Sequence, residues 1–198
     1  MSKFTVFYLI FLLISTINRL RMRKRILSKN TSFGKISVKW TLTALTFSYL
    51  LIVVFTTTEY FICQRNINYL VTVIGFFLYL TGLLAREIPV KILGRYWSPN
   101  VEIREDQSLI KEGIYRYLRH PYYLLLLLEL LGFTLVPNAY YTFFICLIFY
   151  TFIIYLRIWH EEKALIERFG QEYIDYKKEV PGLIPLKKKK LKDREEYQ

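Results

Sequence analysis

Two charged residues four positions apart, near the end of the last apolar segment, offer the clearest chemistry in this sequence. Arg157 and Glu161 fall on one face of a predicted helix, because residues i and i+4 are neighbours there. A plain salt bridge within the helix is one interpretation, although Arg before Glu is the less favourable order. Their position where an apolar segment meets the cytoplasm, opposite His120, favours a functional site instead. We expect Glu162, about a third of a turn away, to be solvated.

The segment 86–121 is the second region with functional character. A loop of this length in so short a chain is usually functional or disordered, and this one is too aromatic for disorder. Gly113 provides a turn with close backbone approach, and Tyr115 lies five residues before His120. Rings beside a backbone turn suit a flat heterocyclic ligand. His120 could simply begin the next helix, but its position across from the charged pair favours a ligand contact.

These groups must be positioned by a strongly apolar chain. Of the 198 residues 54% are apolar, and they lie in blocks separated by basic clusters, while the net charge is +12. Such blocks are typical of integral membrane proteins and argue against a water-soluble enzyme. Two cysteines and two histidines supply neither a disulfide framework nor a set of metal ligands, so we expect no metal. The chain shows no nucleic-acid-binding module, so we interpret the basic charge as a topology signal.

Five apolar blocks qualify as membrane-spanning helices, which need roughly 20 residues each. The blocks are 4–17, 40–62, 69–85, 122–136 and 139–159. The first lacks a signal-peptide cleavage pattern and ends in an arginine-rich stretch, so we interpret it as a span. Pro137 and Asn138 alone join the last two blocks, so these must form a tight helical hairpin. The sequence therefore predicts an all-α integral membrane protein with five transmembrane helices, in which the polar ends of the C-terminal hairpin are neighbours.

The basic residues predict the orientation of this bundle. With five spans, 26 of the 28 Lys and Arg residues fall on one side of the membrane, and only Lys3 and Arg65 fall on the other. The positive-inside rule places the 26 in the cytoplasm, with the N-terminus outside and the C-terminus in the cytoplasm. Glu59 and Arg65, near the outer face, look like topology markers. The four lysines 187–190 would lie at anionic headgroups.

A combination of short motifs links residues 94–185 to a known family. The motifs are Gly113-Ile-Tyr115, then Arg119-His120-Pro121-x-Tyr123, then Arg157-x-x-x-Glu161-Glu162, and finally Phe169-Gly170-x-Glu172-Tyr173-x-x-Tyr176 before Pro185. In this combination the sequence resembles the isoprenylcysteine carboxyl methyltransferase family, with its phospholipid methyltransferase relatives. The resemblance covers nearly half of the chain; the combination is specific, whereas any single motif is weak.

The resemblance implies an integral-membrane methyltransferase that binds S-adenosyl-L-methionine in a cytoplasmic pocket and takes a lipid or prenylated substrate from the bilayer for carboxyl O-methylation. It implies that Arg157 and Glu161 are the catalytic residues, with Arg157 facing the substrate. The residues implied to contact the cofactor are Gln107, Ser108, Leu109, Ile110, Tyr115, His120, Pro121, Tyr122, Tyr123 and Glu161. The eight glycines never form the Gly-x-Gly of a soluble cofactor-binding turn, so the pocket must be built from loops and helices.

This interpretation divides the chain into N-terminal transmembrane helices (1–93), a methyltransferase core (94–185) and a basic cytoplasmic tail (186–198). Two residues depart from the family pattern: Gln107 stands where His is common, and Leu125 stands where many members have Gly. These departures support one alternative, a non-catalytic membrane scaffold with a degenerate pocket. Another alternative is methylation of a different lipid, at an amine headgroup or at a phenolic or enolic hydroxyl. The sequence does not identify the methyl acceptor.

Three further residues in the predicted spans need a role. Glu129 is costly to ionise in lipid, so it either functions or bonds, in its protonated form, to another helix. Gly75 and Gly82, seven residues apart on the third span, would permit close helix packing or leave a cleft for an alkyl chain. With the last hairpin, this span would form the lateral gate for the lipid.

Overall fold

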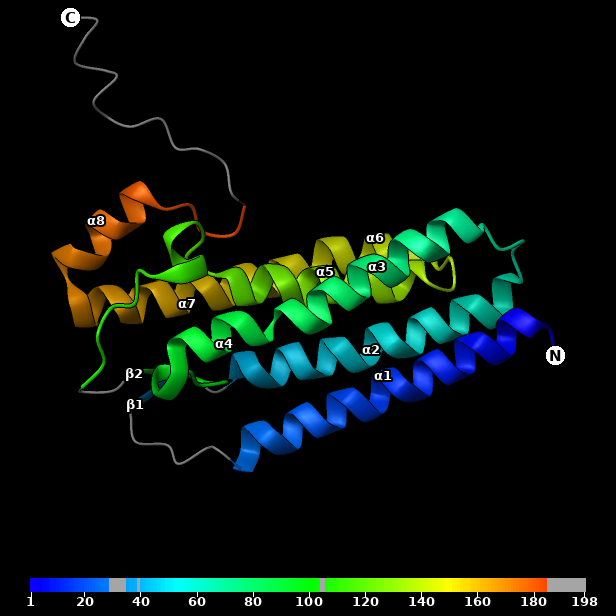
Figure 1. Cartoon of the computed structure of the whole chain (residues 1–198), viewed down its shortest axis with the longest axis horizontal. Coiled ribbons are helices and arrows are strands. Elements are labelled where there is room, and N and C mark those ends of the chain that lie inside the picture. The colour runs from blue at the N-terminus through cyan, green and yellow to red at the C-terminus, as the bar shows by residue number, and fades with distance from the viewer. Residues whose placement is uncertain (29–34, 39, 104–105, 185–198) are drawn as a thin grey trace, which may run out of the picture.

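In the computed structural model the chain is a bundle of helices that run side by side (Figure 1). The structure describes residues 1–28, 35–38, 40–103 and 106–184, so the predicted basic tail lies outside the described residues. The helices are α1 (Lys3–Ser28), α2 (Trp40–Cys63), α3 (Tyr69–Ala85), α4 (Glu87–Leu93), α5 (Pro121–Leu135), α6 (Tyr140–Ile145), α7 (Thr151–Phe169) and α8 (Gln171–Glu179). Shorter elements are the 3-10 turns η1 (Gly94–Tyr96) and η2 (Gly113–Arg116) and the π-helical η3 (Cys146–Tyr150), which joins α6 to α7.

Among the described residues, four stretches are long and apolar enough to cross a membrane. They are Lys3–Arg21, Trp40–Cys63, Tyr69–Tyr96 and Tyr140–Phe169, and α5 is a shorter apolar helix of 15 residues. These elements match the five predicted blocks, and the predicted helical membrane architecture is confirmed. On α3 the side chains of Leu70, Phe77 and Leu84 are 68–69% exposed and form an apolar stripe. The start of α1 lies at the opposite end of the bundle from α8 (Figure 1), as five passes produce.

Glycines let α3 and α5 approach each other closely. A methyl group added at Gly75 would lie 2.7 Å from the Leu135 Cβ. Methyl groups at Gly82 of α3 or Gly132 of α5 would meet the facing backbone at even shorter distances. Gly82 faces the carbonyl of Leu125, so the helices pack closely where Leu125 departs from the family pattern. The alternative of an alkyl-chain cleft at these glycines is therefore wrong, because α5 fills that space.

The outer turn of the C-terminal hairpin depends on Asn138 and Glu59. Asn138 has a φ of +59°, and its side-chain oxygen accepts a backbone N–H just before α3 at 2.7 Å. Glu59 of α2 accepts the backbone N–H groups of Tyr141 and Thr142 at 3.0 and 2.8 Å, at the start of α6. Arg65 pairs with the same carboxylate at 2.7 Å. The interpretation of Glu59 and Arg65 as mere topology markers is therefore wrong, since they hold the hairpin turn in place.

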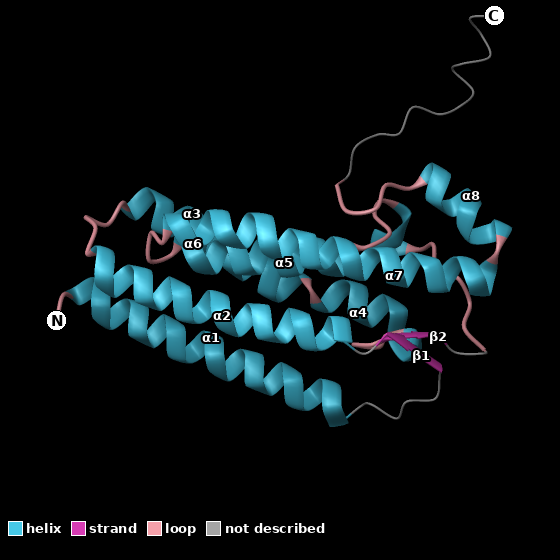
Figure 2. Ribbon diagram, turned by 180° about the vertical axis from the view of Figure 1, so that it is seen from behind, coloured by secondary structure: helices cyan, strands magenta, loops and turns pink. Residues whose placement is uncertain are grey.

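A short ribbon that the sequence did not predict joins two distant segments. β1 (Lys35–Val38) pairs antiparallel with β2 (Val101–Ile103), with Lys35 opposite Ile103. Strands of three and four residues carry too little periodicity to be predicted. The ribbon connects the segment before α2 to the loop between α4 and α5, near the start of α2 (Figure 2). It thereby helps to position that loop at the end of the bundle where α5 begins.

Inside the bundle, Glu129 of α5 forms an ion pair with Arg86 at the end of α3. The Arg86 Nη1 lies 2.5 Å from a Glu129 oxygen, and the two side chains are 1% and 6% exposed. The structural alternative for Glu129 was a protonated acid bonded to another helix; the structure shows the bond to another segment, and the partner is an arginine. A pair buried this deeply is costly to break, since removing one partner leaves an uncompensated charge.

We expect Gly82→Ala to lower the free energy of unfolding by about 1–3 kcal/mol, because the added methyl group meets the α5 backbone rather than a flexible side chain. Leu84→Ala, on the exposed side of the same helix, is the matched control and should change stability little. Reversible denaturation of the purified protein in detergent micelles measures both variants. Equal stability of Gly82→Ala and the wild type would show that α3 and α5 do not pack as closely as described.

Candidate active site

A cavity of about 680 Å³ lies at the end of the bundle where α5 begins and α7 ends. Its wall is formed by the start of α5, by α7 and α8, and by the loop between α4 and α5. The cavity then extends along α1 and α2, where its lining is mostly apolar. Volumes of about 300–1,000 Å³ are typical of ligand-binding sites.

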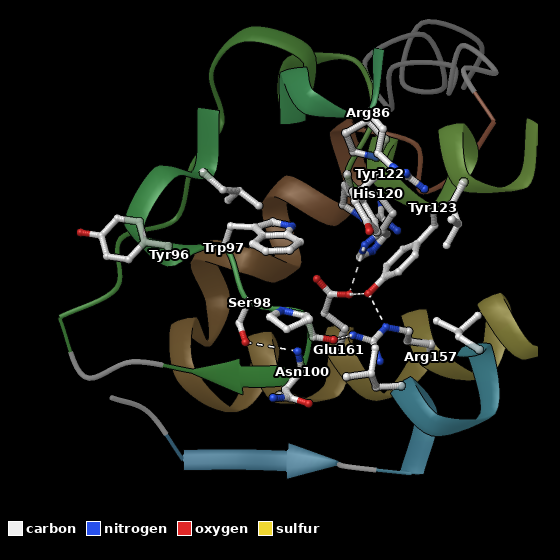
Figure 3. A pocket seen from close by; sticks show the side chains of 18 of the residues that line it. Arg86, Tyr96, Trp97, Ser98, Asn100, His120, Tyr122, Tyr123, Arg157 and Glu161 are labelled. Atoms are coloured by element: carbon white, nitrogen blue, oxygen red, sulfur yellow. Dashed lines mark hydrogen bonds and ion pairs between the residues drawn. The ribbon is translucent and has the colours of Figure 1, made fainter. Parts of the chain in front are cut away.

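All of the residues that the sequence nominated for the site line this cavity. They are Gln107, Ser108, Leu109, Ile110, Tyr115, His120, Pro121, Tyr122, Tyr123, Arg157 and Glu161. The predicted hairpin accounts for part of this meeting, since it places the start of α5 beside Arg157 and Glu161 of α7 (Figure 3), while residues 107–110 and Tyr115 come from the loop between α4 and α5. The structure thus brings the nominated residues together, while their individual roles remain predictions.

The hydroxyl of Tyr123 lies between the two charged residues (Figure 3). It donates a hydrogen bond to Glu161 Oε2 at 2.7 Å and accepts one from Arg157 Nε at 2.7 Å. Arg157, which is only 3% exposed, also donates to the Thr41 hydroxyl at 2.8 Å and to the Pro99 carbonyl. The interpretation as a plain salt bridge within the helix is therefore wrong, because a tyrosine of the neighbouring helix joins the two charges.

Glu162, which we expected to be solvated, is 8% exposed and lies at the centre of a charged network. The Arg119 guanidinium lies 2.6 Å and His120 Nε2 lies 3.1 Å from its Oε1. Lys177 of α8 lies 2.5 Å from its Oε2. His120 stands between two glutamates, because its Nδ1 is 4.0 Å from Glu161 Oε2. The expectation failed because α8 folds back toward the face of α7 that carries Glu162.

Hydrogen bonds hold the segment 177–182 against the two residues that precede α5. The N–H groups of Arg119 and His120 donate to the carbonyls of Pro181 and Gly182, both at 3.0 Å. The Arg119 side chain donates to two further carbonyls of the same segment. These contacts give a physical reason for two motifs that lie far apart in the sequence, because Arg119 fixes the chain after α8 against the start of α5.

Tyr176 of α8 ties the same region to the loop. Its hydroxyl donates to the Tyr115 carbonyl at 2.5 Å. Burial raises the pKa of Tyr176 to about 12, so the hydroxyl keeps its proton and remains a donor at physiological pH. The position of Tyr115 in the cavity wall therefore depends on the docking of α8.

Sequence reasoning missed the half of the cavity that lies along α1 and α2. Its lining includes Thr16, Arg19 and Leu20 of α1 and Thr46 and Tyr49 of α2. No described residue within the bounds of α3 lines the cavity, but Arg86, directly after α3, does, so the lateral gate at the end of the third span stays a prediction. The signal that could have indicated this half was a set of polar residues inside apolar spans, above all Arg19.

The residue types at the polar end fit a cofactor that combines a flat ring with cationic or hydroxyl groups. The Tyr122 ring lies 6.0 Å from the Trp97 ring and 5.7 Å from the Tyr123 ring, centroid to centroid. Among the described lining residues Glu161 is the only carboxylate, and its side chain is 33% exposed. Tyr123 engages one of its oxygens, and the other faces the space beside Trp97 (Figure 3). A carboxylate placed in this way can form strong charge-assisted hydrogen bonds.

We expect Tyr123→Phe to lower the free energy of unfolding by about 1–3 kcal/mol, because Arg157 and Glu161 each lose a hydrogen bond in a buried site. Tyr122→Phe is the matched control, since the Tyr122 hydroxyl bonds to none of the described residues. Denaturation of both variants in the same detergent measures the difference. If the two variants prove equally stable, the Tyr123 hydroxyl does not join the charged pair.

Known proteins are similar in sequence to part of this chain. The sequence model of the Isoprenylcysteine carboxyl methyltransferase (ICMT) family matches residues 73–167. Protein-S-isoprenylcysteine O-methyltransferase of Saccharomyces cerevisiae is 35% identical over 129 residues, which cover 59% of this chain and 50% of that protein. Uncharacterized protein YpbQ of Bacillus subtilis is 36% identical over 75 residues, which cover 38% of this chain and 45% of that protein.

The helices also superimpose on a solved structure, the eukaryotic intramembrane Ras methyltransferase ICMT. The TM-score is 0.58 at 25% sequence identity, and the match covers 70% of this chain and 52% of that chain. The chain thus spans about half the length of the relatives it matches. Residues 73–167 carry the sequence of the isoprenylcysteine carboxyl methyltransferase family, and the resemblance predicted from the motifs is confirmed.

Proposed function

We propose that this chain is a membrane-embedded methyltransferase that transfers a methyl group from S-adenosyl-L-methionine to the carboxylate of a lipidic, isoprenylcysteine-like acceptor. The observation that carries this proposal is the shape and lining of the cavity. Its polar end holds every residue nominated for the cofactor, and its other half runs between apolar side chains of α1 and α2. A soluble donor and an apolar acceptor from the bilayer would therefore meet in one cavity.

The polar end supplies groups suited to S-adenosyl-L-methionine. Residues 107–110, Tyr115 and the start of α5 would hold the cofactor, and Glu161 would bind its cationic or hydroxyl groups. The bound cofactor supplies a methyl group that its sulfonium already activates. The protein then has to align donor and acceptor and to exclude water. Arg157 would contribute its positive charge and the orientation of Tyr123.

The charges around the cavity favour an acidic acceptor over an amine. The arginines among the described lining residues are Arg19, Arg86, Arg119 and Arg157. Glu129 pairs with Arg86 and Glu162 pairs with Arg119, and the third carboxylate, Glu161, is the one that the cofactor would engage, so these arginines outnumber the neighbouring carboxylates by one. A protonated amine would be repelled and would need a base to lose its proton, whereas a carboxylate is already ionised. This balance favours carboxyl O-methylation over N-methylation of a phospholipid headgroup.

We expect the purified protein to bind S-adenosyl-L-methionine in calorimetry, and Glu161→Gln to weaken that binding about tenfold or more, because a charge-assisted hydrogen bond is lost. Glu167→Gln is the matched control, since it removes an exposed carboxylate from the same helix and should leave the affinity unchanged.

Two outcomes would contradict this part of the proposal. A wild-type protein that is folded but does not bind S-adenosyl-L-methionine would remove the enzyme assignment and would favour the scaffold alternative. Equal affinities of wild type and Glu161→Gln would leave the activity possible but would remove Glu161 from the cofactor site.

The proposed orientation has the N-terminus outside and the C-terminus in the cytoplasm, with the polar end of the cavity in the cytoplasm. The count of basic residues on the two sides supports it, and so does the position of the start of α1 and of α8 at opposite ends of the bundle. Terminal tags in sealed inside-out vesicles should then show a protease-accessible C-terminus and a protected N-terminus. Equal accessibility of the two tags would contradict the five-span topology.

A further inference from the structure

Arg19 brings a cation into the apolar half of the cavity. It lies on α1, lines the cavity, and its side chain is 28% exposed. Arg21, two residues further along the same helix, is exposed. Snorkelling to the membrane surface is the usual behaviour of an arginine near the end of a span. Arg19 does not follow it, because its guanidinium lies over the Tyr49 ring of α2, 4.3 Å from the ring centroid.

The donors of Arg19 are available to a ligand. Among the described residues, its polar contact is an ion pair with Glu129 at 3.9 Å, and no hydrogen bond to a described residue holds the guanidinium. Its five N–H donors can therefore bind an anion in the cavity. Arg157 differs in this respect, because its guanidinium already donates to protein oxygens from three segments.

The charge of Arg19 is also incompletely balanced. Glu129 lies 2.5 Å from Arg86 and only 3.9 Å from Arg19, so its carboxylate is committed mainly to Arg86. Two arginines thus share one carboxylate in a membrane-embedded bundle, which leaves an excess positive charge. An ionised side chain inside a membrane segment is costly and usually marks a functional site with a partner. Arg19 lies 3.9 Å from the nearest Glu129 oxygen, so an anion bound in the cavity could approach its guanidinium more closely than Glu129 does.

The surroundings of Arg19 indicate what carries that anion. Leu20 of α1 and Leu50 and Val53 of α2 line the same part of the cavity, next to Thr46 and Tyr49. Such a wall suits an apolar chain that ends in an acidic head. The Tyr122 ring, which lies 5.9 Å from the Arg86 guanidinium and 5.7 Å from the Tyr123 ring, connects this cluster to the proposed cofactor end.

We infer that Arg19, held in place by Glu129 and Tyr49, binds the acidic group of the lipid acceptor and selects acidic over neutral lipids. This inference rests on the proposed function, because it treats the bound lipid as the methyl acceptor. It assigns a specificity-determining residue outside the family match of residues 73–167. Arg86 holds the Glu129 carboxylate in place, and Arg157 orients Tyr123.

The test compares two probes that differ only in charge, N-acetyl-S-farnesylcysteine and its carboxamide. Calorimetry measures their affinities for the 198-residue protein in nonionic detergent. We expect the wild type to prefer the carboxylate probe by about tenfold or more, and Arg19→Gln to lose that preference. Arg19→Lys should retain part of it, because an ammonium keeps the charge but loses the planar fork of donors. The affinity for S-adenosyl-L-methionine should be the same in all variants.

Arg21→Gln is the matched control, since it removes the same charge from an exposed position of α1 and should keep the wild-type preference. Wild-type preference in Arg19→Gln, or no preference in the wild type, would overturn the inference. If Arg19→Gln does not fold, the probe preferences of Arg19→Gly and of Arg19→Lys are measured in reconstituted bilayers instead. Full wild-type preference in both variants would overturn the inference equally. Failure of the wild type to bind S-adenosyl-L-methionine would instead contradict the proposed function and leave the probe comparison as an independent result.

Discussion

Arg157 carries its charge into a nearly sealed part of the bundle, and the groups that it binds come from three separate segments. Tyr123 belongs to α5, Thr41 to α2, and Pro99 to the loop beside β2. A buried guanidinium is costly unless its donors are satisfied, so these segments must come together for the fold to be stable. The Tyr123 hydroxyl also donates to Glu161, so the position of Glu161 depends on the same contacts. The site geometry and the docking of the loop therefore depend on one another.

The position of the cavity follows from this arrangement. The hairpin of α5 and α7 forms its centre, Tyr173 and Tyr176 of α8 line its polar end, and α1 and α2 line its apolar half. The glycines of α3 and α5 let these two helices pack closely, so no space for a lipid chain remains between them. We propose that an apolar acceptor enters beside α1 and α2, the helices that the family match does not cover.

The sequence predicted those features that depend on composition or on local spacing. The apolar blocks predicted the helices, the two residues Pro137 and Asn138 predicted the hairpin, and the residues nominated for the site all line one cavity. It did not predict features that depend on which helix faces which. The burial of Glu162 needs the return of α8, and the pairing of Glu129 needs Arg86 from another helix. Helical spacing places a residue on a face but does not say what that face meets.

Methyl transfer from radiolabelled S-adenosyl-L-methionine to N-acetyl-S-farnesylcysteine, with the protein reconstituted in lipid vesicles, tests whether this cavity performs carboxyl methylation. The product of that reaction is a methyl ester, which mild base hydrolyses to the free acid and methanol. We predict that the label enters the farnesylated product and is released by base as volatile methanol. Label that stays bound after base treatment, as an N-methyl or ether methyl group would, or no transfer by folded, cofactor-binding protein, would contradict carboxyl methylation.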